Sequence, residues 1–396
     1  MRLPLLLLSV FLIINILVDT YIYKVLKRRF RSLWPKRVQL WSAIALFILI
    51  VLVICLPKRN CSDSMLRAIM WMLYTYIAFY VPKYLFVIID LIARIPQLFR
   101  RKRLGWLSVI GGVAAFILFG TMWWGAFINR FNIDVNEVTV EIEGLPDEFD
   151  GYTIAQFSDM HVGTFGNDTT FVAKFVDTLN SLHADAIVFT GDIVNSKTSE
   201  LLPHVSPFSR LTAPDGVYSI LGNHDYGDYS EWKSPEAKKA NLDLLKKLQG
   251  EMGWRLLLNE TVMLRHNGDS LALIGVENIG DPPFKVYGSL DRAYPNLSDS
   301  VAKILLTHNP AHWVDSISGH DDMRVPLSLS GHTHAMQIEI LGWSPAKYRY
   351  PTWGGMYSDS DKKHQLYVNI GSGTVGFPSR IGATPEITLI TLKKLK

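Results

Sequence analysis

Short polar clusters of Asp, Asn and His follow five apolar runs in the second half of the chain. Five of the 11 histidines lie in these clusters, and no histidine precedes the first cluster. A single cluster of this kind is typical of a polar turn. Five clusters at one sheet edge would be destabilised by mutual repulsion and by desolvation unless a cation bound them. We therefore expect a metal site. The clusters are Asp159-Met160-His161, Gly191-Asp192, Asn223-His224-Asp225, Thr307-His308-Asn309 and Gly331-His332-Thr333-His334.

The donor types restrict which metal these clusters can hold. Carboxylate, imidazole and amide donors together suit Mn, Fe, Co, Ni or Zn. No cysteine follows Cys61, so a thiolate zinc site is excluded. Seven candidate ligands are too many for one ion, so two divalent ions sharing a carboxylate are expected. Such a pair, about 3.5–4 Å apart, can clamp the attacking and leaving oxygens of a phosphoryl transfer.

Strands must position these clusters, because each cluster directly follows a short apolar run. Open α/β sheets hold their ligands at the carboxyl ends of the strands. Runs of this length, bounded by glycine and polar residues, are typical of buried strands. The predicted strands that end at a cluster are Thr153–Phe157, Ala186–Thr190, Val217–Leu221, Lys303–Thr307 and Leu327–Ser330.

Helices alternate with the first of these strands. Helical periodicity predicts helices over Asp168–Leu182, with Asp168 as the N-cap, over Glu200–Leu211 and over Pro235–Gly250. Helix and strand in alternation, followed by many strands, indicates sheet layers flanked by helices. Further strands are predicted over Val138–Ile142, Val262–Arg265, Leu271–Val276, Gln365–Ile370 and Glu386–Leu392.

In order and spacing, the five clusters resemble the motifs of the calcineurin-like metallophosphoesterase superfamily. The pattern D-x-H, G-D, G-N-H-D, T-H and G-H-T-H extends over about Tyr152 to Leu392. The resemblance implies an α/β four-layer αββα sandwich, a metal-dependent phosphoric ester hydrolase activity and two divalent ions. None of these motifs lies in the first 127 residues.

The resemblance also implies a role for each motif residue. Water activated by the ions would attack phosphorus. His224 would protonate the leaving oxygen, and Asp225 would orient its ring. The implied ligands are Asp159, His161 and His334 for one ion, Asn223, His308 and His332 for the other, and Asp192 as the bridge.

The C-terminal segment is similar to one branch of this superfamily, the membrane-associated phosphodiesterases that include UDP-2,3-diacylglucosamine hydrolase-like members. Pro378-Ser-Arg380-Ile-Gly382, followed by Pro385-Glu386-Ile387, carries this likeness and makes Arg380 a candidate substrate-binding residue. The chain departs from close relatives after His334, where Ala335-Met336 replaces two glycines. This departure predicts a narrower pocket near the metals.

The N-terminal third is much more apolar than the rest of a chain that is 48% hydrophobic. Four of its apolar runs are long enough to cross a bilayer. We expect about four transmembrane helices over residues 1–127, a junction over 128–150 and the metallophosphoesterase domain over 151–396. Lys83, in the third run, is expected to snorkel to the headgroups. The runs are Leu3–Tyr23, Val38–Leu56, Ala68–Ile89 and Gly105–Phe127.

The loops between these runs predict the orientation of the chain. Lys24–Arg37 carries seven Lys or Arg and Arg94–Arg103 carries five, whereas Pro57–Leu66 carries only two, Lys58 and Arg59. Basic loops stay in the cytoplasm, so the catalytic domain is expected outside it, on a bacterial inner or plasma membrane. A miscounted third run is the alternative, with a cytoplasmic domain. The net charge of +4 reflects these flanks, so no nucleic-acid partner is expected; the oligomeric state is left open.

Two aromatic-rich segments, Pro282–Pro295 and Trp343–Tyr357, do not resemble regular elements, and the second directly follows the strand after the histidine pair. Trp353 is a candidate substrate-binding residue in an apolar wall that faces the membrane. Packing beneath long loops is the alternative. The sequence thus favours a phosphodiesterase or pyrophosphohydrolase, with a lipid-linked substrate such as UDP-diacylglucosamine. A soluble substrate and a non-catalytic metal-binding sensor or scaffold stay open.

Overall fold

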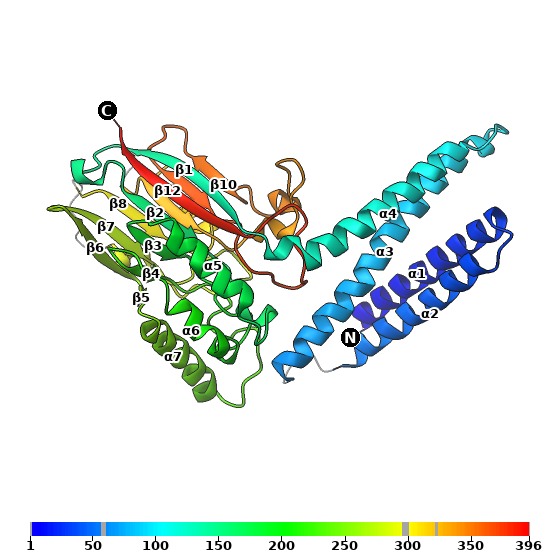
Figure 1. Ribbon diagram of the computed structural model, residues 1–396, viewed down its shortest axis with the longest axis horizontal. Coiled ribbons are helices and arrows are strands. Elements are labelled where there is room, and N and C mark those ends of the chain that lie inside the picture. Colours follow the sequence, from blue (N-terminus) through cyan, green and yellow to red (C-terminus); the bar gives the residue numbers. More distant parts are fainter. Residues whose placement is uncertain (1, 57–60, 295–300, 321–323, 396) are drawn as a thin grey trace. The chain divides into compact units, whose positions relative to one another are not determined.

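The computed structural model describes residues 2–56, 61–294, 301–320 and 324–395, and it divides the chain into two compact units. The first unit comprises Met1–Cys61 and Ala68–Ala126, and the second comprises Ser62–Arg67 and Phe127–Lys396. Figure 1 shows the elements of both units, coloured along the sequence.

Four long helices make up the first unit. Each is long and apolar enough to cross a membrane, as the four runs predict. Within the predicted outer loop, residues 57–60 lie outside the described residues. The helices are α1 (Arg2–Arg29), α2 (Trp34–Cys55), α3 (Asp63–Leu98) and α4 (Gly105–Phe127).

The snorkelling predicted for Lys83 is wrong. Lys83 Nζ lies 2.8 Å from Asp19 Oδ1, and the two side chains are only 12% and 13% exposed. Gln39 Nε2 and Tyr80 Oη donate to the same carboxylate, at 2.8 and 2.7 Å. Because α1 supplies an anion at the same depth, the Lys83 ammonium is neutralised within the helical unit.

Two six-stranded sheets make up most of the second unit. Strands β2 to β5 are parallel neighbours in the first sheet, and β7, β8, β9 and β11 are parallel in the second. The first sheet has the order β1 (Asp134–Ile142), β12 (Glu386–Lys394), β2 (Thr153–Phe157), β3 (Ala186–Phe189), β4 (Val217–Ser219), β5 (Arg255–Leu256). The second has the order β10 (Gly355–Ser358), β11 (Gln365–Val368), β9 (Leu327–Ser330), β8 (Lys303–Leu306), β7 (Asp269–Gly275), β6 (Glu260–His266).

Shorter helices complete this unit. The α-helices are α5 (Thr170–Ser181), α6 (Val205–Phe208), α7 (Pro235–Glu251), α8 (Leu290–Ala293) and α9 (Ala311–Ser316). The 3-10 turns are η1 (Asn129–Phe131), η2 (Asp147–Phe149), η3 (Val162–Thr164), η4 (Thr198–Glu200), η5 (Leu202–His204), η6 (His334–Gln337) and η7 (Pro345–Tyr348).

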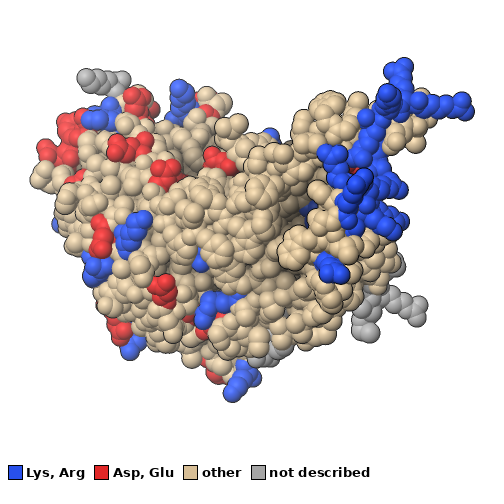
Figure 2. All heavy atoms as spheres, turned by 45° about the vertical axis from the view of Figure 1, so that its right-hand side comes forward, with Lys and Arg blue, Asp and Glu red and all other residues tan. Residues whose placement is uncertain are grey.

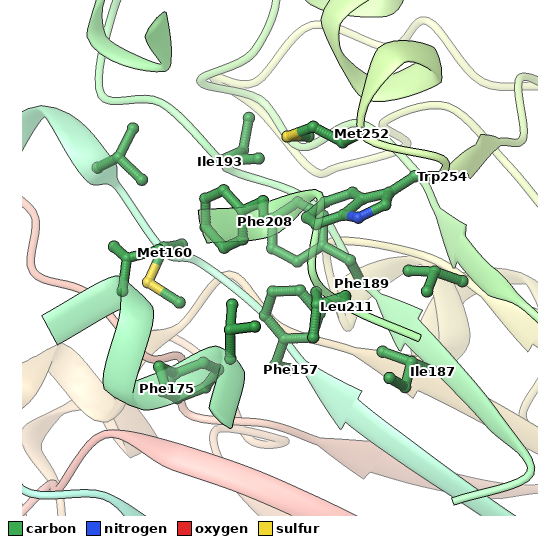
Figure 3. Packing of buried hydrophobic residues seen from close by; sticks show 14 of the residues in the cluster. Phe157, Met160, Phe175, Ile187, Phe189, Ile193, Phe208, Leu211, Met252 and Trp254 are labelled. Carbon is green, nitrogen blue, oxygen red and sulfur yellow. The ribbon is translucent and has the colours of Figure 1, made fainter. Parts of the chain in front are cut away.

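Alternating strand residues divide the core into layers. On β3, Val188 packs between the two sheets, whereas Phe189 packs with α5, α6 and Trp254 on the outer face of the first sheet. Figure 3 shows the hydrophobic cluster on the outer face of the first sheet, in which aromatic rings from strands and helices pack together. On β8, Ile304 faces the inter-sheet core and Leu305 packs with Trp313 of α9. The layers are therefore helices, sheet, sheet and helices, as the family resemblance implies.

Three local predictions differ from the structure. Thr169, not Asp168, is the N-cap of α5, although Asp168 Oδ1 accepts a hydrogen bond from Thr170 N at 3.0 Å. The predicted helix Glu200–Leu211 is broken into η5 and α6, because Pro203 and Pro207 lack backbone donors. The segment Trp343–Tyr357 is not irregular throughout, since it contains η7 and most of β10.

Candidate metal centre

The polar clusters converge because the strands that carry them are neighbours. In the first sheet, the clusters follow β2, β3 and β4, which lie side by side and parallel. In the second sheet, the clusters follow β8 and β9, which are also parallel neighbours. The carboxyl ends of these strands therefore bring all seven candidate ligands into one region.

One group of donors consists of Asp159, His161 and His334, all buried. His334 Nε2 lies 3.2 Å from Asp159 Oδ1 and 3.0 Å from His161 Nε2. His161 Nδ1 contacts the carbonyl of Val194 at 3.1 Å, so its Nε2 faces the group with a lone pair. The three side chains can thus ligate one ion.

A second group is centred on His308. Its Nε2 lies 3.2 Å from both Asn223 Oδ1 and His332 Nδ1, and 3.3 Å from Asp192 Oδ2. Its Nδ1 contacts the carbonyl of Thr190 at 2.7 Å, which again directs Nε2 inward. These four side chains can ligate a second ion.

Asp192 connects the two groups. Its Oδ2 lies 3.6 Å from His161 Nε2 and 3.3 Å from His308 Nε2. Its Oδ1 accepts a hydrogen bond from His224 N at 2.8 Å, which fixes the carboxylate plane. Asp159 is held in the same way, because its Oδ2 accepts from His332 N at 2.9 Å. In each case the other oxygen is left to face the imidazoles.

The backbone at the strand ends is unusual. Five of the seven candidate ligands have left-handed backbone conformations, which cost energy in residues other than glycine. Ala335 and Met336, at the predicted departure from the family pattern, are also left-handed, with φ of 50° and 47°. Ala335 packs with Ile370 and Ala383. The left-handed ligands have φ of 52° (Asp159), 44° (His161), 63° (Asp192), 74° (His332) and 52° (His334).

The charges of the site favour a cation. Burial opposes ionisation of Asp159, but the neighbouring His334 and His308 outweigh it, and the pKa of Asp159 is lowered. Burial also disfavours the charged form of His308, yet Asp192 and Asp159 raise its pKa to about 9. Burial and the adjacent His308 lower the pKa of His332 to about 3, so this ring is neutral, as a metal ligand must be.

The residues present fit a metal ion. Asp159 Oδ1 is buried and has no hydrogen-bond partner among the described residues, which is costly for a carboxylate oxygen. It faces His334 and His161, whose ring nitrogens are the ligands that borderline divalent ions prefer. A cation at this position would satisfy all three groups.

His224 lies beside the donors but is oriented differently from the prediction. Its ring centroid is 4.8 Å from that of His161, and its Nδ1 contacts the carbonyl of Asn195 at 2.6 Å. Asp225 does not orient the ring. Its carboxylate accepts hydrogen bonds from the backbone N–H groups of Asp192, Ile193 and Gly222, at 2.9, 3.0 and 2.9 Å. Asp225 thus fixes the loop that carries Asp192.

Arg380 is not placed to contact a substrate. It is fully buried, and its guanidinium donates to the carbonyls of Gly373, Ala383 and Ile370 at 2.6, 3.0 and 3.1 Å. The remaining contact of its Nη2 is His334 Nδ1, at 3.2 Å. Burial lowers the pKa of Arg380 to about 10, which keeps it charged. The predicted binding role is therefore corrected to support of the loop behind His334.

The aromatic residues that contact the candidate ligands differ from the predicted Trp353. Trp353 packs against the small cluster of Ala335, Ile370 and Ala383, which corresponds to the packing alternative. Phe284 contacts the His332 ring edge-on at 4.7 Å between centroids, and Tyr350 Oη lies 3.0 Å from His332 Nε2. Both belong to the predicted aromatic-rich segments.

Tyr229 is a neighbour of the site that sequence reasoning missed. Its ring stacks on His224 at 4.2 Å, and its hydroxyl accepts from Asn223 Nδ2 at 2.8 Å. The signal was its position six residues after Asn223, on the loop that follows the motif. Phe284, Tyr350 and Tyr229, which we call the aromatic rim, thus contact three of the motif residues.

Comparisons with known proteins match both parts of the chain. Residues 1–130 match the family described as "Probable Calcineurin-like phosphoesterase, transmembrane domain", and residues 152–336 match "Calcineurin-like phosphoesterase". The chain is 33% identical over 276 residues to metallophosphoesterase YkuE of Bacillus subtilis, covering 67% of this chain and 88% of that protein.

Other relatives extend beyond bacteria. A transmembrane protein with metallophosphoesterase domain from Bos taurus is 31% identical over 265 residues, or 65% of this chain. The match spans only 57% of the bovine protein. A metallophosphoesterase of Aquifex aeolicus is 27% identical over 269 residues, covering 67% of this chain and 94% of the relative. With four helices able to cross a membrane and the motifs in place, the chain belongs to the calcineurin-like metallophosphoesterase family, as a membrane-anchored member.

Proposed function

We propose that the protein is a dinuclear metal-dependent phosphoesterase that hydrolyses a phosphodiester or pyrophosphate bond. The observation that carries the proposal is the position of Asp192, whose Oδ2 lies 3.6 Å from His161 Nε2 and 3.3 Å from His308 Nε2. A single carboxylate oxygen between two donor groups has the arrangement of a bridging ligand.

Each motif residue then has a defined task. When bound, two divalent ions of the Mn, Fe, Co, Ni or Zn type would polarise the phosphoryl group and lower the pKa of water. The side chains at the strand ends would hold those ions. We assign Asp159, His161 and His334 to one ion, Asn223, His308 and His332 to the other, and Asp192 to both.

His224 is proposed as the general acid. The Asn195 carbonyl, 2.6 Å from Nδ1, fixes the ring and leaves Nε2 as the atom that can deliver a proton to the leaving oxygen. Tyr229, stacked on the ring, restricts its rotation. This assignment replaces Asp225 with Asn195 as the partner that orients the ring.

The substrate is proposed to be a lipid-linked phosphodiester or pyrophosphate, of which UDP-diacylglucosamine is one example. The membrane anchor raises the effective concentration of the site toward molecules held in the bilayer. The aromatic rim adds apolar surface beside the donors. The basic loops support an extracytoplasmic position for this site, and we propose a bacterial inner or plasma membrane as its location.

The reaction class is tested by hydrolysis of bis(p-nitrophenyl) phosphate against p-nitrophenyl phosphate, with the full-length protein in detergent and a series of divalent metals. The diester should be hydrolysed faster, and only in the presence of metal. Asp243→Asn, at an exposed position of α7, should match the wild type, and Asp192→Asn should be inactive. Lack of any metal-dependent turnover would instead favour a metal-binding sensor.

The substrate class is tested in mixed micelles with UDP-diacylglucosamine and its deacylated form. Acyl chains should raise kcat/KM at least tenfold, and Phe284→Ala should remove most of that gain. Tyr348→Ala is the matched control, because Tyr348 is 79% exposed and, among the aromatic rings of the described residues, contacts only Trp343, edge-on. Equal kcat/KM for both substrates would leave the phosphoesterase but exclude the lipid.

A further inference from the structure

A cavity of about 500 Å³ lies among α1, α2 and α3 in the first unit, which contains none of the motif residues. Its apolar wall includes Ile16, Leu40, Ile44 and Phe47, whose side chains are 53, 47, 40 and 44% exposed. In a helical unit that crosses a membrane, such exposed apolar side chains face lipid. The volume is in the range of ordinary ligand sites.

Polar residues also line the cavity, and the side chains of Asp19 and Asn15 are engaged with neighbouring residues. Asp19 accepts hydrogen bonds from Gln39, Tyr80 and Lys83. Asn15 Nδ2 donates to Tyr76 Oη at 2.6 Å. Because these groups satisfy one another, the cavity is apolar toward a ligand despite an ion pair in its wall. It suits a hydrocarbon chain.

The cavity extends from Asn15 to Tyr23 along α1, which corresponds to about 12 Å at 1.5 Å per residue. Its Tyr23 end is the end nearer to the loop between α1 and α2. Thr20 and Leu40 line the cavity at this end.

Cations lie near this end, about one helical turn from lining residues on the same helix faces. Lys24 follows Thr20 by four residues, and Arg37 precedes Leu40 by three; both cations are exposed. Lys27 and Lys36 are at the equivalent spacing from Tyr23 and Leu40. Figure 2 shows Lys and Arg gathered at one end of the membrane helices.

We propose that this cavity binds one acyl chain of an anionic phospholipid, whose phosphate contacts the basic end formed by Lys24, Lys27, Lys36 and Arg37. An apolar cavity with cations at one end is complementary to a single amphiphile with a negative headgroup. A zwitterionic lipid would fill the cavity equally well but would gain less binding free energy from the cations. The site shares no residue with the candidate metal centre and does not depend on the proposed reaction.

The test is a titration of delipidated full-length protein with phosphatidylglycerol or phosphatidylcholine, followed by native mass spectrometry. The wild type should bind one phosphatidylglycerol at least tenfold more tightly than phosphatidylcholine. Ala43→Phe fills the cavity without removing a cation and should weaken phosphatidylglycerol binding at least tenfold. Val113→Phe, at an exposed position of α4 that does not line the cavity, should bind like the wild type.

A second variant separates charge from shape. Lys24→Gln combined with Arg37→Gln changes only exposed side chains, so the fold is retained even if Ala43→Phe does not fold. This pair should abolish the preference for phosphatidylglycerol and keep phosphatidylcholine binding. Glycerol phosphate, the headgroup without chains, should not compete. The proposal is overturned if the wild type binds both lipids equally, if the charge pair keeps the preference, or if a folded Ala43→Phe binds normally.

Discussion

At the scale of single residues, backbone atoms define the candidate metal centre as much as side chains do. The carbonyls of Val194, Thr190 and Asn195 each contact a histidine Nδ1, and backbone N–H groups hold one oxygen of each carboxylate. This support leaves the remaining donor atoms oriented before any ion arrives, which lowers the cost of binding.

His224 should contribute to turnover but not to metal binding. His224→Ala should retain the metal content of the wild type, because its Nδ1 is engaged with Asn195 rather than with a donor group. Hydrolysis of esters with poor leaving groups should fall by roughly 10²–10⁴-fold. The loss should be much smaller for p-nitrophenolate, which needs little protonation. Equal losses for the two leaving groups would contradict the acid role.

Arg380 should matter mainly for stability. Arg380→Met leaves the carbonyls of Gly373, Ala383 and Ile370 without their donor, at a cost of about 2–4 kcal/mol in the free energy of unfolding. Urea unfolding followed by tryptophan fluorescence measures this loss. Arg210→Met, which removes an exposed ion pair with Asp177, should cost about 1 kcal/mol or less. Similar losses for both would argue against the buried role.

The motif residues were predictable from sequence, whereas their supporting partners were not. Five clusters of Asp, Asn and His identify the candidate ligands without any structure. The partner of His224 is a backbone carbonyl, and every residue has one, so sequence cannot indicate Asn195. Burial of Arg380 arises from packing between distant segments, which also leaves no local pattern.

At the scale of elements, close approach between strand ends depends on glycine. A Cβ on Gly222 would lie 2.2 Å from Asp192 Oδ1, and one on Gly331 would lie 2.3 Å from Asp159 Oδ2. Both carboxylates therefore reach their positions only because the neighbouring strand ends carry no side chain there.

Gly222→Ala should displace Asp192 and impair the site. We expect metal affinity and kcat/KM to fall by about 10–100-fold, the range for losing an outer partner of a metal ligand. Metal titration and steady-state kinetics measure both. The control is Gly250→Ala in α7, where a Cβ meets nothing within 4 Å. It should keep activity and gain about 0.5–1 kcal/mol in stability. Normal metal affinity in Gly222→Ala would contradict this account of the strand ends.

Elements with a strong repeating pattern were predicted well. The strands β2, β3, β8 and β9 are short segments rich in apolar residues, and the structure places them within a residue of the predicted ranges. The failures have physical causes. Prolines interrupt the apolar pattern of Glu200–Leu211, and β5 and β10 are too short for any periodicity to appear.

At the scale of the whole molecule, the sequence predicted that a helical membrane unit precedes the metallophosphoesterase domain. It did not predict the ion pair between Lys83 and Asp19 within the helical unit. Lys83 was noticed and Asp19 was not, because their partnership joins α1 to α3 across 64 positions. Helix pairing in a membrane is decided by such contacts, which a hydropathy pattern does not contain.

Orientation in the membrane is a prediction at this scale. A reporter fused after the C-terminus should be active only outside the cytoplasm, because the basic loops Lys24–Arg37 and Arg94–Arg103 are retained inside. The control is the same reporter inserted in the loop between α1 and α2, which should be active only inside. A cytoplasmic signal from the C-terminal fusion would mean that the number of spans is odd.

The central claim is that two ions bridged by Asp192 perform the hydrolysis, and metal stoichiometry tests it most directly. Full-length protein is stripped by a chelator and reloaded stepwise, while bound metal and bis(p-nitrophenyl) phosphate hydrolysis are measured on the same samples. The account predicts that activity vanishes on stripping and reaches its plateau at two bound ions per chain. Asp192→Asn should bind fewer than two and stay inactive. Full activity with one ion or none, or two tightly held ions and near-normal turnover in Asp192→Asn, would contradict it.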